Sequence, residues 1–226
     1  MARELITGID PAVVRENLER VRERAGDDVE ILIATKYVPI DEFEALAEAG
    51  VTLVGENRQQ DLEAKAERWG DRFTFDFIGT LQSRKVKAIL PRVRLIHSVC
   101  TDSALAQLER HASPDTEVLV QVNVSGEETK AGVAPEELDG FIARCPVRVV
   151  GLMTMPPFTT DPETSRPYFA RLAELAAEHG LRHLSMGTSQ YWPVAVEEGA
   201  TIIRLGSAAL RPADSTSHNR GKEIRS

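Results

Sequence analysis

The 226-residue sequence has few of the features that mark secreted, membrane-spanning or disulfide-rich proteins. It contains only two cysteines, Cys100 and Cys145, so a disulfide framework is excluded and a reducing compartment is expected. No apolar run approaches the about 20 residues that a transmembrane helix requires. The first residues also lack the apolar segment of a signal peptide. We therefore predict a cytoplasmic protein without a membrane partner.

Basic residues are also scarce. Lys and Arg number 27 against 35 Asp and Glu, which gives a formal net charge of −8. Nucleic-acid-binding surfaces are rich in Lys and Arg because they neutralise phosphates, so we expect no nucleic-acid partner. The densest basic stretch, residues 84–94, is typical of a solvated helix face. No His, Cys or Asp cluster has metal-ligand spacing, and we predict no metal site.

The sequence does contain a repeating unit, in which a short apolar run is followed by an amphipathic helical stretch. Continuous apolar runs are typical of parallel strands that are buried on both faces. The predicted strands are residues 29–35, 51–54, 73–78, 94–99, 117–124, 147–153, 183–186 and 201–205. About eight such units in this length predict a (β/α)8 TIM barrel, with a doubly wound open sheet as the alternative.

The two ends of the sequence differ from the repeating unit. Asp10 and Pro11 precede a periodic apolar stretch, which predicts an extra N-terminal helix capped by the aspartate. Residues 212–226 are polar and aperiodic, which predicts a disordered tail. We therefore expect one barrel domain over residues 1–211.

Lys36 stands out because it directly follows the first apolar strand. In a barrel of this kind the carboxyl ends of the strands carry the active face. Desolvation at such a position favours a neutral, nucleophilic amine that can form a Schiff base with an aldehyde. The alternative is an ordinary lysine at a strand end that bends into solvent.

Glycine and serine residues cluster after the seventh and eighth strands, in the segments 185–189 and 204–207. The loops after these two strands frequently hold phosphate in barrels, through backbone N–H groups. Glycine allows the backbone to approach a ligand closely, and serine adds hydroxyl hydrogen bonds. Each segment alone is weak evidence, but the two together favour a phosphorylated ligand.

Many segments, in the same order along the chain, resemble those of the pyridoxal phosphate homeostasis protein family. The members of this family are single-domain relatives of the barrel half of alanine racemase. The segments include Ala34-Thr35-Lys36, Gly55-Glu56-Asn57, Phe77-Ile78-Gly79-Thr80-Leu81-Gln82-Ser83-Arg84-Lys85, His97-Ser98-Val99, Gly151-Leu152-Met153-Thr154-Met155, Ser185-Met186-Gly187 and Arg204-Leu205-Gly206-Ser207. The matching segments run from about residue 31 to residue 207. The resemblance implies a barrel of the fold-type III class, which binds pyridoxal 5′-phosphate (PLP).

The resemblance also implies roles for individual residues. Lys36 would form the internal aldimine with PLP, Asn57 would lie beside the cofactor ring, and Arg204 would face the pyridine nitrogen. The phosphate would be surrounded by Ser185, Gly187, Ser189, Gly206 and Ser207. Lys130 matches a lysine that receives PLP transiently, and a plain surface lysine is an equal alternative.

An arginine at the pyridine nitrogen argues against catalysis. PLP enzymes commonly use a protonated ring nitrogen as part of an electron sink, whereas guanidinium can only donate a hydrogen bond and leaves that nitrogen unprotonated. We therefore predict a PLP carrier or buffer without catalytic residues, a monomer that serves apo forms of PLP-dependent enzymes as transient recipients. The alternatives are a racemase-like fold-type III enzyme acting on small amino acids, and a barrel enzyme that binds another sugar phosphate.

Several positions depart from the family pattern. Asp76 stands where a histidine usually occurs, which alters the charge near the end of the third strand. Tyr191 replaces a common acidic residue, so a weaker cap is expected for the following helix. The segment after Ser207 lacks its usual ending, which predicts a short last helix. His97 is expected to be a hydrogen-bonded structural histidine at the barrel rim, and Glu56 a partner for a basic residue.

Overall fold

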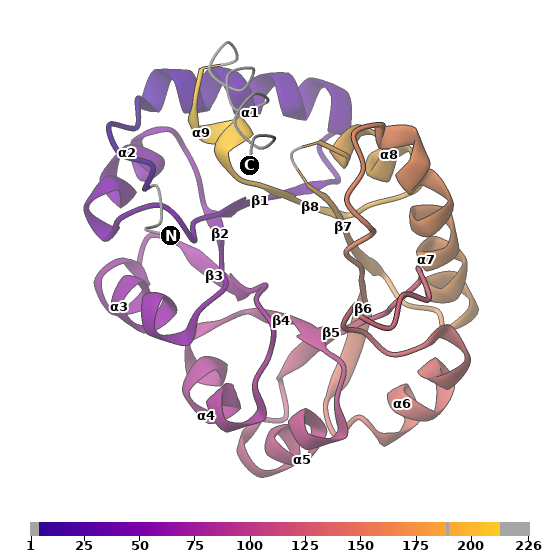
Figure 1. Cartoon of the computed structure of the whole chain (residues 1–226). Coiled ribbons are helices and arrows are strands. Elements are labelled where there is room, and N and C mark those ends of the chain that lie inside the picture. Colours follow the sequence, from indigo (N-terminus) through magenta and orange to yellow (C-terminus); the bar gives the residue numbers. More distant parts are fainter. Residues whose placement is uncertain (1–4, 189, 213–226) are drawn as a thin grey trace, which may run out of the picture.

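Eight parallel strands close into a barrel in which their order follows the sequence (Figure 1). The computed structural model describes residues 5–188 and 190–212. The strands are β1 (Glu30–Ala34), β2 (Leu53–Glu56), β3 (Thr74–Phe77), β4 (Leu95–Val99), β5 (Glu117–Gln121), β6 (Arg148–Met153), β7 (His183–Thr188) and β8 (Ile202–Leu205). Ile33 of the first strand pairs with Leu205 of the last, which closes the ring. The predicted barrel is confirmed, and the open-sheet alternative is wrong.

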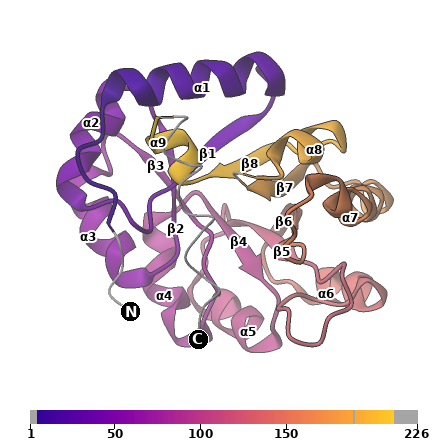
Figure 2. The ribbon, with the colours of Figure 1, turned by 45° about the horizontal axis from the view of Figure 1, so that its top comes forward.

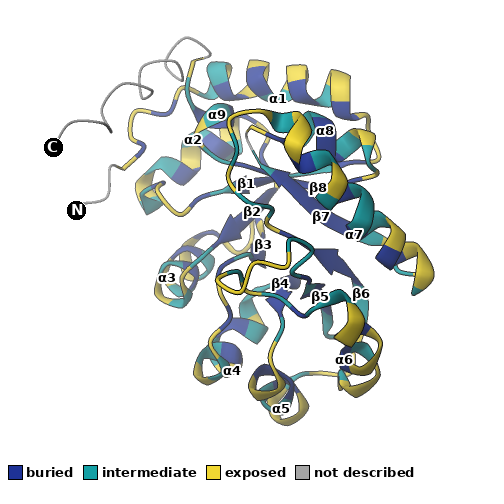
Figure 3. Cartoon of the chain, turned by 45° about the vertical axis from the view of Figure 1, so that its right-hand side comes forward, coloured by how far each residue is buried: buried dark blue, intermediate teal, exposed yellow. Residues whose placement is uncertain are grey.

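Helices surround the barrel and turn their buried sides toward it (Figure 3). Around the ring these are α2 (Phe43–Glu48), α3 (Gln59–Trp69), α4 (Val86–Ile89), α5 (Asp102–His111), α6 (Leu138–Arg144), α7 (Arg166–Glu178), α8 (Trp192–Glu197) and α9 (Ser207–Leu210). In α7, for example, Phe169, Leu172 and Leu175 are buried at helical spacing. This spacing is the reason that the segment reads as an amphipathic helix in the sequence.

The extra N-terminal helix, α1 (Pro11–Ala25), lies outside the ring next to α9 (Figure 2). Its cap is the predicted one, because the Asp10 side chain accepts a hydrogen bond of 2.8 Å from the backbone N–H of Ala12. Buried Asn17 then ties α1 to the end of the chain by donating to the carbonyl oxygens of Ala209 and Arg211. The helix thereby holds α9 in place beside the end of β8.

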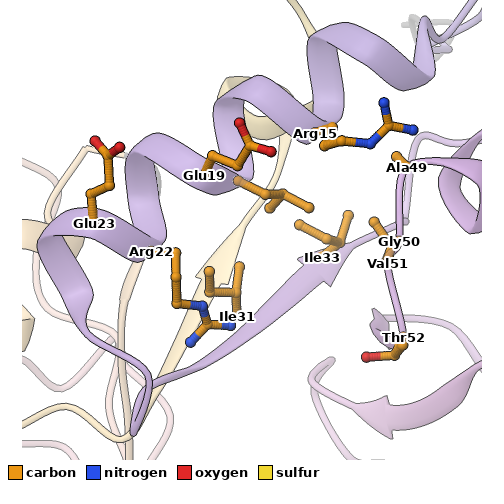
Figure 4. Close-up of a pocket in the computed structure, with 11 residues that line it drawn as sticks. Arg15, Glu19, Arg22, Glu23, Ile31, Ile33, Ala49, Gly50, Val51 and Thr52 are labelled. Atoms are coloured by element: carbon orange, nitrogen blue, oxygen red, sulfur yellow. The ribbon is translucent and has the colours of Figure 1, made fainter.

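A cleft of about 480 Å³ separates α1 from β1 and the turn before β2 (Figure 4). Its two arginines already have partners: Arg15 donates to the carbonyl oxygen of Glu48, and Arg22 donates to that of Val29. The cleft lies on the outer side of the barrel wall, away from the carboxyl ends of the strands.

The interior of the barrel begins with an apolar layer. Its members come from six different strands and contact one another, which is possible only inside the ring: Leu32, Leu53, Leu95, Leu119, Met153 and Ile202. Side chains alternate between the two faces of a strand. Residues two positions further along β4 and β8, His97 and Arg204, are therefore directed into the same interior.

The predicted tail falls, apart from Pro212, outside the described residues, and the domain boundary at residue 211 stays a prediction. Among the described residues, every helix is too short or too polar to span a lipid bilayer.

Candidate cofactor-binding site

The residues singled out in the sequence gather on four neighbouring strands of the ring, β7, β8, β1 and β2. Lys36 lies two residues beyond the end of β1, and Asn57 directly follows β2. Ser185 and Gly187 belong to β7, Arg204 belongs to β8, and Gly206 and Ser207 form the turn into α9. Ser189 lies outside the described residues. The fold thus brings the described candidates to one side of the barrel.

Lys36 is exposed, so the expected desolvation of its amine is not found. Its Nζ lies 4.7 Å from the centroid of the Tyr37 ring, within the range of a cation–π contact. The reason for the exposure is the position of the residue beyond the last strand pairing of β1, at the open end of the ring. An aldehyde in solution can therefore reach this amine.

A buried ion pair holds the residues that directly precede Lys36 and Asn57. Lys65 of α3 donates from Nζ to Glu56 Oε1 at 2.5 Å and to the carbonyl oxygen of Thr35 at 2.8 Å. The Thr35 hydroxyl also donates to Glu56 Oε1, at 2.5 Å. The predicted role of Glu56 as the partner of a basic residue is confirmed, and α3 holds the ends of β1 and β2 together.

Asn57 carries an unused hydrogen-bonding atom. Its Oδ1 is buried and has no hydrogen-bond partner among the described residues. A buried acceptor without a partner costs free energy, which a bound ligand with a donor group can recover.

Arg204 is a buried cation, with only 5% of its surface exposed. Its guanidinium donates to the carbonyl and hydroxyl oxygens of Ser185 and, at 3.0 Å, to the carbonyl oxygen of Thr154. It also donates to the sulfur of Met155, at 3.0 Å. In the described part of the chain no carboxylate forms an ion pair with it. Desolvation lowers the pKa of Arg204 to about 10, so the group stays protonated at neutral pH.

Ser185 connects Arg204 to two buried groups that the sequence did not place in the site. The Ser185 hydroxyl lies 2.8 Å from His97 Nδ1, and His97 Nε2 lies 3.1 Å from Asp76 Oδ2. His97 is hydrogen-bonded as expected, but it is fully buried inside the barrel rather than at its rim. The Ser185 hydroxyl therefore lies in the barrel interior, between the Arg204 guanidinium and the His97 ring.

The pKa values of this pair follow from burial and from the neighbouring cation Arg94. Burial lowers the pKa of His97 and outweighs the opposing effect of Asp76, so the imidazole is neutral at pH 7. Burial alone would raise the pKa of Asp76, but hydrogen bonds from His97 and Arg94 outweigh it, and the pKa lies below its usual value. Asp76 is therefore an ionised carboxylate inside the barrel.

The two glycines differ in the space around them. Gly187, near the end of β7, has φ +86°, and a Cβ there would lie 2.7 Å from Ala195 Cβ, so the end of this strand packs against α8 and requires glycine. A Cβ at Gly206 would meet no atom within 4 Å. The space on the Cβ side of Gly206 is therefore unfilled.

The departures noted in the sequence have local consequences. Tyr191 gives α8 no side-chain cap, and its hydroxyl instead donates to the carbonyl oxygen of Thr159 at 2.8 Å. The last helix, α9, is only four residues long. Lys130 lies half-buried in the loop after β5. Within residues 5–188 and 190–212, no group of three His, Cys, Asp or Glu side chains is placed to hold a metal ion.

Comparisons with known proteins decide the family. The profile of the alanine racemase N-terminal domain matches residues 9–211. A pyridoxal phosphate homeostasis protein of Aquifex aeolicus is 41% identical over 211 residues, which cover 86% of this chain and 92% of the relative. The chain belongs to the pyridoxal phosphate homeostasis protein family.

Solved structures agree with this assignment. The structure of PipY from Synechococcus elongatus with PLP bound matches with a TM-score of 0.77 and 29% identity, over 88% of this chain and all of that one. Alanine racemase from Corynebacterium glutamicum matches with a TM-score of 0.71 and 16% identity, over 89% of this chain and 60% of that one, which shows a shared barrel fold.

Proposed function

We propose that this pyridoxal phosphate homeostasis protein binds PLP covalently through Lys36 and carries or buffers the cofactor with little or no turnover. The observation that carries the proposal is the grouping, on four neighbouring strands, of a reachable lysine, a buried arginine that contacts no carboxylate among the described residues, and the glycine at the turn into α9. PLP combines an aldehyde, a basic ring nitrogen and a phosphate, and each matches one of these features.

The bound cofactor would be held at three points. Lys36 would hold PLP through the aldehyde of the cofactor. Gly206 and Ser207 would hold the phosphate, and Asn57, whose Oδ1 accepts no hydrogen bond among the described residues, would lie beside the ring. Arg204 would donate to the pyridine nitrogen and so leave it unprotonated, which would make the bound cofactor a weak electron sink. The last point supports a carrier rather than an enzyme.

A spectroscopic titration tests the covalent attachment. Adding PLP to the wild-type protein should produce the near-ultraviolet or visible band of a Schiff base, and borohydride should fix the adduct on the peptide that contains Lys36. In Lys36→Ala both signals should disappear. Lys87→Ala, an exposed lysine elsewhere, and Lys130→Ala serve as matched controls and should retain them. A band that persists in Lys36→Ala would place the attachment elsewhere.

The absence of turnover has its own test. Purified, PLP-loaded protein should neither racemise nor decarboxylate amino acids above the rate of free PLP. Multiple turnovers on any small amino acid would overturn the carrier role and favour the racemase-like alternative. Fluorescence-monitored transfer of PLP to an apo PLP-dependent enzyme should proceed in the same preparation.

A further inference from the structure

A continuous line of hydrogen-bonded side chains crosses the barrel interior from Arg204 to the amino-terminal ends of the strands. We call it the polar column: Arg204, Ser185, His97, Asp76 and Arg94. The members come from β8, β7, β4, β3 and the residue before β4. Only the last of them has appreciable access to solvent, with 33% of its side chain exposed.

Hydrogen bonding in the column runs in one direction. Arg204 can only donate, so the Ser185 oxygen accepts from it. Ionised Asp76 can only accept, so neutral His97 carries its proton on Nε2, and its Nδ1 accepts the Ser185 proton. Each donor and acceptor therefore has one consistent arrangement.

The charges along the column alternate. Asp76 accepts two hydrogen bonds from Arg94, at 3.1 and 2.7 Å, and one from the backbone N–H of Leu95 at 3.1 Å. Arg94 also pairs with Glu30 at the beginning of β1. Asp76 thus balances two cations, Arg94 directly and Arg204 through two neutral groups. Hydrogen-bonded chains in a low-dielectric interior polarise one another, which makes this indirect balance effective.

We propose that Asp76 and His97 are positioning residues that hold Ser185 and Arg204 for the ring nitrogen of the cofactor. The inference rests on the proposed function, because it concerns how Arg204 meets PLP. It also assigns Ser185 to the ring-nitrogen side of the site rather than to the phosphate. Gly206 and Ser207, which would hold the phosphate, form none of the hydrogen bonds of the column.

Two probes distinguish recognition of the cofactor ring from recognition of its phosphate. 4-Deoxypyridoxine 5′-phosphate has the ring nitrogen and the phosphate but no aldehyde, and inorganic phosphate has neither ring nor aldehyde. Asp76→Asn should weaken binding of the first probe about fivefold, because it removes the negative charge that accepts the hydrogen bond from His97 in the column. Binding of inorganic phosphate should remain unchanged. A variant that merely disturbed β7 and β8 would weaken both.

A double-mutant cycle tests whether the effect travels through the column. In a Ser185→Ala background the chain is already broken, so adding Asp76→Asn should produce no further loss for 4-deoxypyridoxine 5′-phosphate. Independent effects would instead multiply, since free energies at uncoupled sites add. Multiplying effects, or an Asp76→Asn variant that binds like the wild type, would overturn the proposal.

Further measurements separate an effect of the column from a general loss of stability and from a failure of the proposed function. Val118→Ala removes a fully buried side chain on the outer face of β5, and it should lower the melting temperature without changing either affinity. If Asp76→Asn does not fold, His97→Asn replaces it in the same cycle with the same expected outcomes. A wild-type protein that gives no Schiff-base band in the PLP titration described above would refute the proposed function itself, whatever the outcome of the cycle.

Discussion

Lys65 and Arg204 are both cations buried beside the candidate site, and they are neutralised in different ways. Lys65 touches its carboxylate directly, at 2.5 Å from Glu56, on the side of the site that carries Lys36. Within the described part of the chain, Arg204 meets only carbonyl and hydroxyl oxygens and a sulfur. It is linked to the carboxylate of Asp76 through Ser185 and His97. The first arrangement pairs the two charges without a ligand, although Glu56 Oε2 has no hydrogen-bond partner among the described residues. The second leaves the guanidinium able to respond to a ligand.

Breaking the direct pair should have the largest effect on stability. Glu56→Gln leaves the Lys65 ammonium buried without a counter-charge, and we expect a loss of about 3–5 kcal/mol in the free energy of unfolding, measured with urea. The matched double variant, Glu56→Leu with Lys65→Met, removes both charges and should lose far less. An equal loss in the two variants would mean that packing, and not charge, governs this region.

The link from Arg204 to Asp76 through His97 should make the stability of the protein sensitive to mild acid. The pKa of His97 in the folded state lies below its unfolded value of about 6.5, because burial disfavours the imidazolium. The unfolded chain then binds the proton more readily, so stability is lost as pH falls below about 6.5, with a slope of up to about 1.4 kcal/mol per pH unit. In His97→Asn this contribution should be absent.

Urea unfolding of the wild type and of His97→Asn between pH 7.5 and pH 5 measures the difference. The stability advantage of the wild type should shrink toward the acid end. His111→Asn, at an exposed position, controls for the loss of a histidine and should parallel the wild type. A constant difference between wild type and His97→Asn across the range would contradict a neutral, buried imidazole.

The smallest effect on stability is expected at Thr35, which contacts the ion pair of Glu56 and Lys65. Thr35→Val removes the hydroxyl that donates to Glu56 and leaves the Lys65 contact in place, so we expect a loss of about 1–2 kcal/mol in the free energy of unfolding. Thr35→Ser keeps the hydroxyl and provides the matched control. PLP affinity should change little in either variant, since Lys36 remains and the backbone of Thr35 is still held by Lys65.

The sequence predicted the barrel well because each strand is a local apolar run and each long helix a local periodic one. It also placed Lys36 and Arg204 at strand ends, which depends only on where each apolar run stops. The polar column was not predicted, since Asp76, His97 and Ser185 lie on different strands and meet only through the register of the closed sheet. Lys65 was missed for a similar reason, because it looks like any charged residue on a helix until its buried partner is known.

The seam between β1 and β8 lies in the middle of the candidate site, with Lys36 on one edge and Arg204 on the other. A chain that has not yet docked β8 consequently lacks the candidate groups that this strand carries into the site, Arg204, Gly206 and Ser207. A ligand that binds only the closed barrel shifts the equilibrium, by mass action, away from forms in which β1 and β8 are not paired. Hydrogen exchange along this seam should slow when PLP is added, before protection changes elsewhere in the wall.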